Sequence, residues 1–408
     1  MDLKYSNSPL FPPSEPPEGA HLVSVGPIEG VGETLEARWL DMLVKLGQAL
    51  AANKAAPPHL SALSIRTRDS QAIMDADQRM LDLLYREALG GNFPDMAVVT
   101  DPDCDLAVEA YAILRPAPAG PVYADMDAPT LNYEYSARAQ VPEHMAYFQA
   151  WRQEGAAWRA QNLTEELSFG EGPGRKIDLY MPDGATNPPL HIFVHGGYWQ
   201  ALDKSDHGHF FAAMLEAGVA VAVPNYDLLP MAGLGLADVM EQCREAVDAL
   251  WDAAGVYGYD RDRITISGHS AGGHLGAVLA ATDWPTRKGD MPKDLVKGAI
   301  LVSGLYDLEP LRHTGVNKAI GMDEDAAVRL SPIHMKPAHP MSVVVAVGGA
   351  ESDEFRRQSR EFAAVWQQRG AETHYYALDG LNHFTVLEAL GDPASELGAR
   401  AMRLVAWV

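Results

Sequence analysis

The stretch Ile266–Leu275, ISGHSAGGHL, decides the fold. It contains the pattern Gly-x-Ser-x-Gly, in which Gly268 and Gly272 flank Ser270. The β-branched run ITIS precedes the pattern, and the helix-like segment GGHLGAVLAA follows it. Glycines at these two places let a strand and a helix approach closely, so that the serine takes a strained conformation at the start of the helix. A glycine-rich turn with an idle serine is the alternative, but the strand before and the helix after favour Ser270 as a nucleophile.

Apolar runs alternate with helical stretches on both sides of this motif. The runs are KIDLYMP, LHIFVHG, VAVAVPNY, RITISGHS, GAILVSGL, SVVVAVGG and THYYALD, and the helical stretches include LADVMEQCREAVDALWDAAG and EFRRQSREFAAVWQQRG. Strands that are apolar throughout are buried on both faces, which predicts an α/β fold with a largely parallel sheet between helices. Because ligands bind at the carboxyl ends of such strands, we expect the chemistry just after each run.

A serine nucleophile needs a base and an acid that orients the base. In a fold of this kind they follow the serine in the order acid, then histidine. His383 follows the last apolar run and precedes a terminal helical stretch, so it is the predicted base. The run SVVVAVGG leads into Glu351 and Asp353, and either carboxylate is suited to be the acid. The residues alone leave that choice open.

The loop after LHIFV is the expected oxyanion site. It continues as His-Gly-Gly-Tyr-Trp, which places Gly196 and Gly197 directly after a strand. Backbone N–H groups of these two glycines and of Ala271 would stabilise the negative charge of a tetrahedral intermediate.

The chain from about residue 130 onward resembles the kynurenine formamidase (arylformamidase) branch of the α/β-hydrolase superfamily. The matching stretches are HGGYWQALDKSD, VAVPNYDLLP, ISGHSAGGHL, SGLYDLEPL, ESDEFRRQSREF and NHF. The resemblance implies that Ser270 is the nucleophile, His383 the base and Glu351 the acid. The family has an Asp at the place of Glu351, which leaves Asp353 as an alternative. It also implies acyl transfer from an aromatic formamide such as N-formylkynurenine, a step in tryptophan catabolism, without cofactor or metal.

The substrate is a separate question from the catalytic groups. Tyr198, Trp199 and Tyr226 would form an aromatic wall for the substrate ring, although aromatic residues after strands commonly serve packing. The same catalytic groups would also suit a carboxylesterase for small acyl esters. Pocket shape separates the two activities, and the sequence does not show it.

The first part of the chain has a different pattern. HLVSVG, the amphipathic stretch Thr34–Ala52, LSALSIRT, the helical stretch Gln71–Leu89, MAVVT and DLAVEAYAIL follow one another. This order predicts a small α+β domain over residues 21–120, with helices on one face of a sheet. We expect residues 1–20 to be a disordered or draped arm and residues 121–129, after RPAPAGP, to be a linker to the hydrolase domain at 130–408.

The stretches HLVSVGPIEG, GGNFPDMAVV and LAVEAYAI resemble the RidA/YjgF family. The resemblance implies a chorismate-mutase-like fold that forms trimers. Active members deaminate enamines or imines and hold the substrate carboxylate with an arginine. Asp95 and Met96 stand at that place here, and Glu109 stands where many members have an acid. A trimerising or binding module is therefore favoured over a working enamine or aminomuconate deaminase, which would make the chain bifunctional.

Composition excludes several classes of function. The net charge of −23 argues against binding to nucleic acid or to anionic membranes. The start of the chain has no apolar secretory run, and no stretch approaches the ~18 apolar residues of a membrane span. Only Cys104 and Cys243 occur, and no zinc-like Cys and His spacing exists. We expect a cytoplasmic homo-oligomer that acts on a small molecule.

Overall fold

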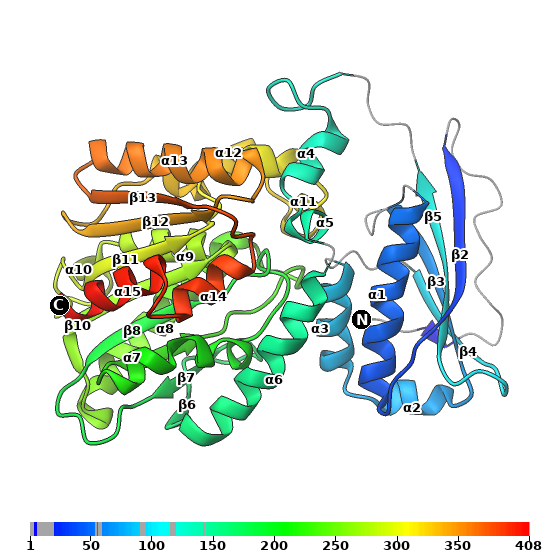
Figure 1. Cartoon of the computed structure of the whole chain (residues 1–408), viewed down its shortest axis with the longest axis horizontal. Coiled ribbons are helices and arrows are strands. Elements are labelled where there is room, and N and C mark those ends of the chain that lie inside the picture. The colour runs from blue at the N-terminus through cyan, green and yellow to red at the C-terminus, as the bar shows by residue number, and fades with distance from the viewer. Residues whose placement is uncertain are drawn as a thin grey trace. The chain divides into compact units, whose positions relative to one another are not determined.

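The computed structural model describes residues 4–5, 20–53, 55, 59–89, 95–114, 120–141 and 143–407. The chain forms two compact units, residues 1–128 and 129–408 (Figure 1). Within the predicted arm at residues 1–20, Lys4–Tyr5 form strand β1, which pairs in parallel with β4. Apart from Ala20, the rest of that arm lies outside the described residues, as do residues 115–119 of the predicted break.

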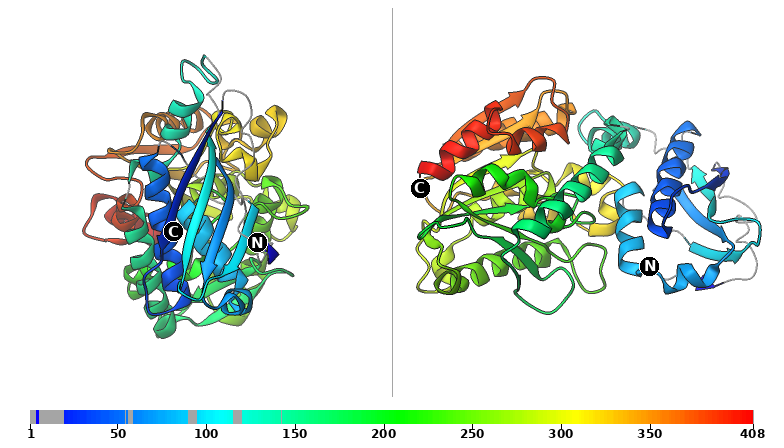
Figure 2. Two further views of the ribbon diagram at one scale, coloured as in Figure 1. Left: turned by 90° about the vertical axis from the view of Figure 1, so that its right-hand side faces the viewer. Right: turned by 60° about the horizontal axis from the view of Figure 1, so that its bottom comes forward.

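Unit 1 contains a five-stranded mixed sheet in the order β1-β4-β3-β5-β2 (Figure 2). Its further elements are β2 (His21–Glu29), α1 (Leu35–Ala52), β3 (Leu60–Thr67), α2 (Ser70–Asp75), α3 (Gln78–Leu89), β4 (Asp95–Thr100) and β5 (Ala107–Leu114). Helices α1 and α3 pack together, and α1 also packs on β2 and β5. Asp95 opens β4, and Glu109 lies on β5 with a carboxylate oxygen 3.7 Å from Arg66. The RidA-like identity of this unit stays a prediction.

The predicted helical stretch Gln71–Leu89 is two helices, not one. Between α2 and α3, the carboxylate of Asp77 accepts a hydrogen bond from the backbone N–H of Met80 at 3.3 Å. The side chain of Gln78 donates to the carbonyl of Ile73 near the end of α2 at 2.8 Å. Asp side chains that bond nearby backbone groups favour helix starts over helix interiors, so the chain turns here.

Unit 2 is built on an eight-stranded sheet in the order β13-β12-β11-β10-β8-β9-β7-β6. The strands are β6 (Glu165–Ser168), β7 (Lys176–Tyr180), β8 (Pro189–Val194), β9 (Ala220–Pro224), β10 (Asp260–His269), β11 (Val296–Val302), β12 (Ser342–Gly348) and β13 (Glu372–Leu378). Neighbours from β13 to β9 pair in parallel, whereas β7 pairs antiparallel with β9 and β6. All seven apolar runs are strands, and the sheet is largely parallel, as predicted.

The helices of this unit lie before, between and after the strands. They are α4 (Ala128–Glu134), α5 (Ala137–Gln140), α6 (His144–Asn162), α7 (Ala212–Glu216), α8 (Leu236–Tyr257), α9 (Ala271–Ala280), α10 (Trp284–Arg287), α11 (Asn317–Ile320), α12 (Glu324–Leu330), α13 (Asp353–Gln368), α14 (Thr385–Gly391) and α15 (Glu396–Trp407). Short 3₁₀ turns lie at η2 (Lys204–Asp206), η3 (Gly208–Phe211), η4 (Pro310–His313) and η5 (Pro332–His334). Within the described ranges, no helix has both the length and the apolar character that a membrane span requires.

Helices cover both faces of the central sheet. On β11, a Cβ atom added to Gly298 would lie 2.8 Å from a methyl carbon of Leu404, in α15. Leu301 of the same strand lies against Gly276 of α9. Residues three apart on a strand point to opposite faces, so α9 and α15 pack on opposite sides of β11. The carboxyl ends of the parallel strands thus form one edge between two helical layers, where the predicted site residues follow the strands.

Candidate active site

Ser270 lies in a strained turn between β10 and α9. Its backbone angles are φ 57° and ψ −122°, in a region that costs a non-glycine residue about 1–3 kcal/mol. The Ser270 N–H donates to the carbonyl of Val302 at 2.8 Å, and the Gly273 N–H donates to the carbonyl of Ser270 at 2.8 Å. These bonds hold the serine at the N-terminus of a ten-residue helix, where the peptide dipoles favour negative charge.

The glycines around Ser270 are required by close backbone contacts. A Cβ on Gly268 would lie 2.0 Å from the carbonyl oxygen of Gly272, and a Cβ on Gly272 would lie 1.9 Å from that of Val194. A Cβ on Gly196 would lie 3.0 Å from the Cβ of Ser270. The predicted oxyanion loop after β8 therefore runs directly beside the serine.

Glu351, and not Asp353, lies against His383. The Glu351 Oε2 atom accepts a hydrogen bond from Nδ1 of His383 at 2.6 Å. Its Oε1 atom accepts from the Ser303 hydroxyl at 2.5 Å and from the Gly348 N–H at 2.7 Å. The Glu351 side chain is 1% exposed, whereas that of Asp353 is 86% exposed. A buried, fully bonded carboxylate suits an orienting acid, and a solvated one does not.

The histidine of this pair is also joined to the serine turn. Because the Nδ1 atom of His383 donates to a carboxylate, its Nε2 atom is left as the basic nitrogen. The carbonyl oxygen of His383 accepts a hydrogen bond from Nε2 of His269 at 2.8 Å, and the two rings lie 4.7 Å apart. His269 directly precedes Ser270. Burial, together with the charge of His383, holds the pKa of His269 well below its usual value, so this ring stays neutral.

The predicted oxyanion loop has a strained backbone. Gly197 has φ +100°, and a Cβ there would lie 2.2 Å from the carbonyl oxygen of Ala201. Tyr198 and Trp199 follow with φ angles of 53° and 58°. Non-glycine residues in this region persist only where the surrounding structure holds them. The loop therefore needs firm anchors on both sides.

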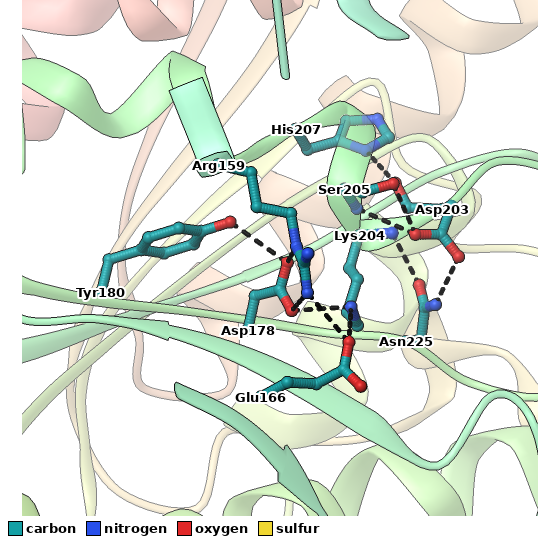
Figure 3. Close-up of polar contacts among 9 residues, drawn as sticks. All are labelled: Arg159, Glu166, Asp178, Tyr180, Asp203, Lys204, Ser205, His207 and Asn225. Carbon is teal, nitrogen blue, oxygen red and sulfur yellow. Dashed lines mark hydrogen bonds and ion pairs between the residues drawn. The ribbon is translucent and has the colours of Figure 1, made fainter. Parts of the chain in front are cut away.

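One anchor is an ion-pair network around the buried carboxylate of Asp178 (Figure 3). The Lys204 ammonium lies 2.6 Å from Oδ1 of Asp178 and 2.8 Å from Oε2 of Glu166. Arg159 of α6 approaches the same two carboxylates at 2.5 and 2.9 Å. Asp178 is fully buried on β7. Because a buried charge without a partner is costly, these ion pairs hold the Lys204 ammonium against Asp178 of the sheet.

A second set of bonds shapes the loop around Asp203. Its carboxylate accepts from the N–H and hydroxyl of Ser205 at 2.9 and 2.8 Å, and from the amide of Asn225 at 2.6 Å. Burial alone would raise the pKa of Asp203, but these hydrogen bonds hold it below its usual value. The Asn225 oxygen accepts from the Lys204 N–H at 2.7 Å, and the ring of His207 bonds to the Asp203 carbonyl at 2.8 Å. Figure 3 shows these groups beside the ion pairs.

Two of the predicted substrate aromatics have packing contacts. Trp199 is fully buried, edge-on to the ring of His274 with centroids 5.1 Å apart. The Tyr226 hydroxyl donates to the carbonyls of His195 and Gly196, each at 3.0 Å, and its ring stacks on His195 at 4.5 Å. Both side chains hold the loop, and their contact with a substrate stays a prediction.

Tyr198, the third of these aromatics, is half-buried. Its hydroxyl donates to the carbonyl of Tyr135, between α4 and α5. The Tyr135 hydroxyl in turn donates to Glu354 at 2.7 Å and accepts from Gln358 at 2.6 Å, both on α13. The segment before α6 thus ties the oxyanion loop to the helix that follows Glu351.

Comparison with known proteins identifies the family of this chain. The family model BD-FAE matches residues 177–324. The kynurenine formamidase of Danio rerio is 34% identical over 243 residues, which are 57% of this chain and 80% of that protein. That of Salmo salar is 35% identical over 244 residues, with the same shares. The chain belongs to the kynurenine formamidase family. It is therefore a serine hydrolase.

Solved structures support the fold of this family member. A protein from Silicibacter sp. is 33% identical with a TM-score of 0.59, covering 67% of this chain and 98% of that one. A thermostable carboxylesterase from a metagenomic library is 20% identical with a TM-score of 0.51, covering 64% and 94%. The second likeness shows the α/β-hydrolase fold alone.

Three features of this family member's site were not predicted from its sequence. For His269 a signal was present, because this residue occupies the variable position of the Gly-x-Ser-x-Gly motif. Ser303 follows β11 with φ 49° and carries no signal of its own. The pair of Lys204 and Asp178 joins residues 26 positions apart, which one sequence cannot reveal.

Proposed function

We propose that this family member hydrolyses the formamide of an N-formyl aromatic amine such as N-formylkynurenine. The observation that carries the proposal is the buried Glu351–His383 pair, joined through His269 to the strained Ser270 turn. The 34% identity to a kynurenine formamidase supports the substrate class.

In the proposed first step, Nε2 of His383 takes the proton of the Ser270 hydroxyl as its oxygen attacks the formyl carbon. Glu351 stabilises the imidazolium that forms and keeps the ring in one orientation. His383 then gives the proton to the leaving aromatic amine, and the C–N bond breaks. Water, deprotonated by the same histidine, attacks the formyl ester on Ser270 and releases formate.

The tetrahedral intermediate carries its negative charge on the former carbonyl oxygen. Backbone N–H groups of Gly196, Gly197 and Ala271 are the proposed donors to it. Each such donor contributes about 10²–10³ in rate when it is held in place beforehand. The anchored loop and the N-terminus of α9 supply that fixed geometry.

Hydrolysis of N-formylkynurenine, measured beside that of short p-nitrophenyl esters, tests the proposal. We expect the wild type to prefer the formamide and Ser270→Ala to lose both activities. A strong preference for the esters would instead support the carboxylesterase alternative, for which the same catalytic groups are suited. Retention of formamide hydrolysis by Ser270→Ala would refute the proposed mechanism.

The function of unit 1 is a separate question. A trimerising or binding module stays the favoured prediction, and a deaminase the alternative. Ammonia release from 2-aminoacrylate by the whole chain and by Ser270→Ala separates them. Equal ammonia release by both would support a deaminase in unit 1, and none would remove that alternative.

A further inference from the structure

One hydroxyl group lies behind both glycines of the predicted oxyanion loop. The Tyr226 hydroxyl donates to the carbonyl oxygens of His195 and Gly196, each at 3.0 Å, so that one proton is shared between two acceptors. Nδ1 of His195 also lies 2.9 Å from the Gly196 carbonyl oxygen. These two carbonyls belong to the peptide groups whose nitrogen atoms are those of Gly196 and Gly197.

The direction of each N–H group follows from the direction of the carbonyl in the same peptide group. A trans peptide group is planar, and its N–H and C=O bonds point to opposite sides. Both of these peptide bonds are trans. Because both carbonyls accept from the Tyr226 hydroxyl, the N–H groups of Gly196 and Gly197 point away from it. These are the two donors that the proposed mechanism assigns to the loop.

The orientation of these peptide groups matters because they lie beside the nucleophile. A Cβ atom added to Gly196 would lie 3.0 Å from the Cβ of Ser270 and 2.9 Å from the carbonyl oxygen of His269. Glycine has no Cβ and rotates more freely than any other residue, so two successive glycines do not fix their own peptide planes. A group from elsewhere in the fold has to hold them.

Tyr226 is itself held in place behind the loop. It follows β9, is 1% exposed, and stacks its ring on that of His195 with centroids 4.5 Å apart and planes at 13°. The N–H of the next residue, Asp227, donates to Oε1 of Gln242 at 2.8 Å. Burial raises the pKa of the Tyr226 phenol well above its usual value, so the hydroxyl keeps its proton and stays a donor at neutral pH.

We infer that Tyr226 is a positioning residue of the hydrolase site, whose hydroxyl aims the two glycine N–H donors at the oxyanion. This role rests on the proposed function, because the proposed mechanism supplies the identity of the donors. A donor contributes most when its direction is fixed before the intermediate forms. Without the hydroxyl, the two carbonyls would lose their shared partner, and the peptide groups of Gly196 and Gly197 would turn toward other partners. The donors would stay in the chain but would be misaligned.

The substitution Tyr226→Phe tests the inference, because it removes one oxygen atom and keeps the ring that stacks on His195. With p-nitrophenyl acetate as the substrate, we expect kcat to fall about tenfold to a hundredfold, up to the loss that removal of one whole donor causes. KM should change less than about threefold, because the hydroxyl acts on the transition state and not on the bound ester. The pH at which kcat reaches half of its maximum should stay the same, because Glu351 and His383 are unchanged.

A mimic of the tetrahedral intermediate gives a second measurement. Trifluoroacetophenone is a ketone that the Ser270 hydroxyl would convert into an anionic hemiketal, with its negative charge where the oxyanion forms. Its inhibition constant should rise in Tyr226→Phe by about the same factor as kcat falls, since both report binding of the same charge.

Tyr259→Phe is the matched control. Tyr259 is 2% exposed, and its hydroxyl donates to the carbonyl of Leu250. It directly precedes β10, at the end of that strand away from Ser270. This variant loses a buried hydrogen bond of the same kind, but its kcat and its inhibition constant should stay within about twofold of the wild type. Thermal unfolding checks that both variants are folded.

Several results would overturn the inference. One is a kcat of Tyr226→Phe within about twofold of the wild type, and another is an equal fall of kcat in Tyr259→Phe. A loss in KM alone would place the ring against the substrate instead of behind the loop. A fall of kcat without a rise of the inhibition constant would mean that the oxyanion donors are still aligned.

Failure of the proposed function would look different. A wild type that cleaves p-nitrophenyl acetate but not N-formylkynurenine would remove the formamide proposal and leave the test of Tyr226 as it stands. Loss of ester hydrolysis in Ser270→Ala, beside an unchanged kcat in Tyr226→Phe, would overturn the Tyr226 inference alone.

Discussion

Replacing Glu351 by Gln should abolish most of the hydrolytic activity, because the hydrogen bonds around this side chain would force His383 into the wrong tautomer. The Oε1 position accepts from the Gly348 N–H at 2.7 Å, and a backbone N–H can only donate. The amide oxygen of Gln must therefore occupy that position, which turns its NH₂ group toward Nδ1 of His383. That nitrogen must then accept, so the ring carries its proton on Nε2, where the base is needed.

A histidine in the wrong tautomer cannot take the proton of Ser270. The corresponding change in other triads lowers kcat by about 10⁴, which corresponds to about 5.4 kcal/mol in the activation free energy. The assay is kcat for p-nitrophenyl acetate in wild type, Glu351→Gln and Asp353→Asn, with thermal unfolding as a check on folding. Asp353→Asn should change kcat less than about twofold because its side chain is solvated. A Glu351→Gln enzyme within tenfold of the wild type, or an equal loss in Asp353→Asn, would refute the reasoning.

Three further predictions concern stability and are checked by urea unfolding. Gly272→Ala should destabilise the protein by more than about 3 kcal/mol, because its Cβ would lie 1.9 Å from a backbone carbonyl oxygen. Gly255→Ala, in helix α8 with open space around the added Cβ, should stabilise the protein by about 0.5–1 kcal/mol. Similar changes in the free energy of unfolding for Gly272→Ala and Gly255→Ala would contradict the packing described. Lys204→Met should cost about 1.5–3 kcal/mol, because the buried Asp178 loses one of its two cations and keeps Arg159, and a cost under about 0.5 kcal/mol would mean that the pair of Lys204 and Asp178 is not needed. Burial lowers the pKa of His191 to about 3 in the folded state. Below about pH 6.5 the unfolded state therefore binds a proton that the folded state does not, and the stability of the protein decreases as the pH decreases. His191→Gln should lose about 2 kcal/mol less than the wild type between pH 7 and pH 5, and equal losses would contradict the assigned cause.

The inner strands of the central sheet, such as β8, β9, β11 and β12, could be predicted because they are buried on both faces, which makes them apolar throughout. Strand β6 was missed for the opposite reason. It is four residues long and mostly exposed, and its sequence, EELS, has neither the length nor the apolar content of the other strands. A short edge strand of this kind is specified by its partner, β7, more than by its own residues.

The acid could be narrowed to two residues but not chosen from the sequence. Glu351 and Asp353 are two positions apart in one segment. Ser352 caps the N-terminus of α13 by accepting a hydrogen bond from the Phe355 N–H at 3.3 Å, so Asp353 begins the exposed first turn of the helix. Glu351 stays in the loop and turns inward to Ser303 and His383. The cap fixes this difference, and Ser303, the partner just after β11, lies 48 residues away in the chain.

The loop anchors could not be predicted because they join distant segments. Lys204 and Asp203 are visible in the stretch HGGYWQALDKSD, but their partners lie on β7, on β6 and after β9. A charge in a loop is ordinarily solvated, and only the fold shows that Lys204 is buried. The strained φ angles of Tyr198 and Trp199 likewise belong to the folded loop and have no counterpart in the residue types.

Labelling by a fluorophosphonate, followed by mass spectrometry of the peptides, tests the central claim most directly. The account predicts one phosphonyl adduct, on Ser270, formed in step with the loss of esterase and formamidase activity. Glu351→Gln should be labelled far more slowly, and Ser270→Ala not at all. An enzyme that is inactivated with its label on another residue, or that stays active with Ser270 fully labelled, would contradict the account.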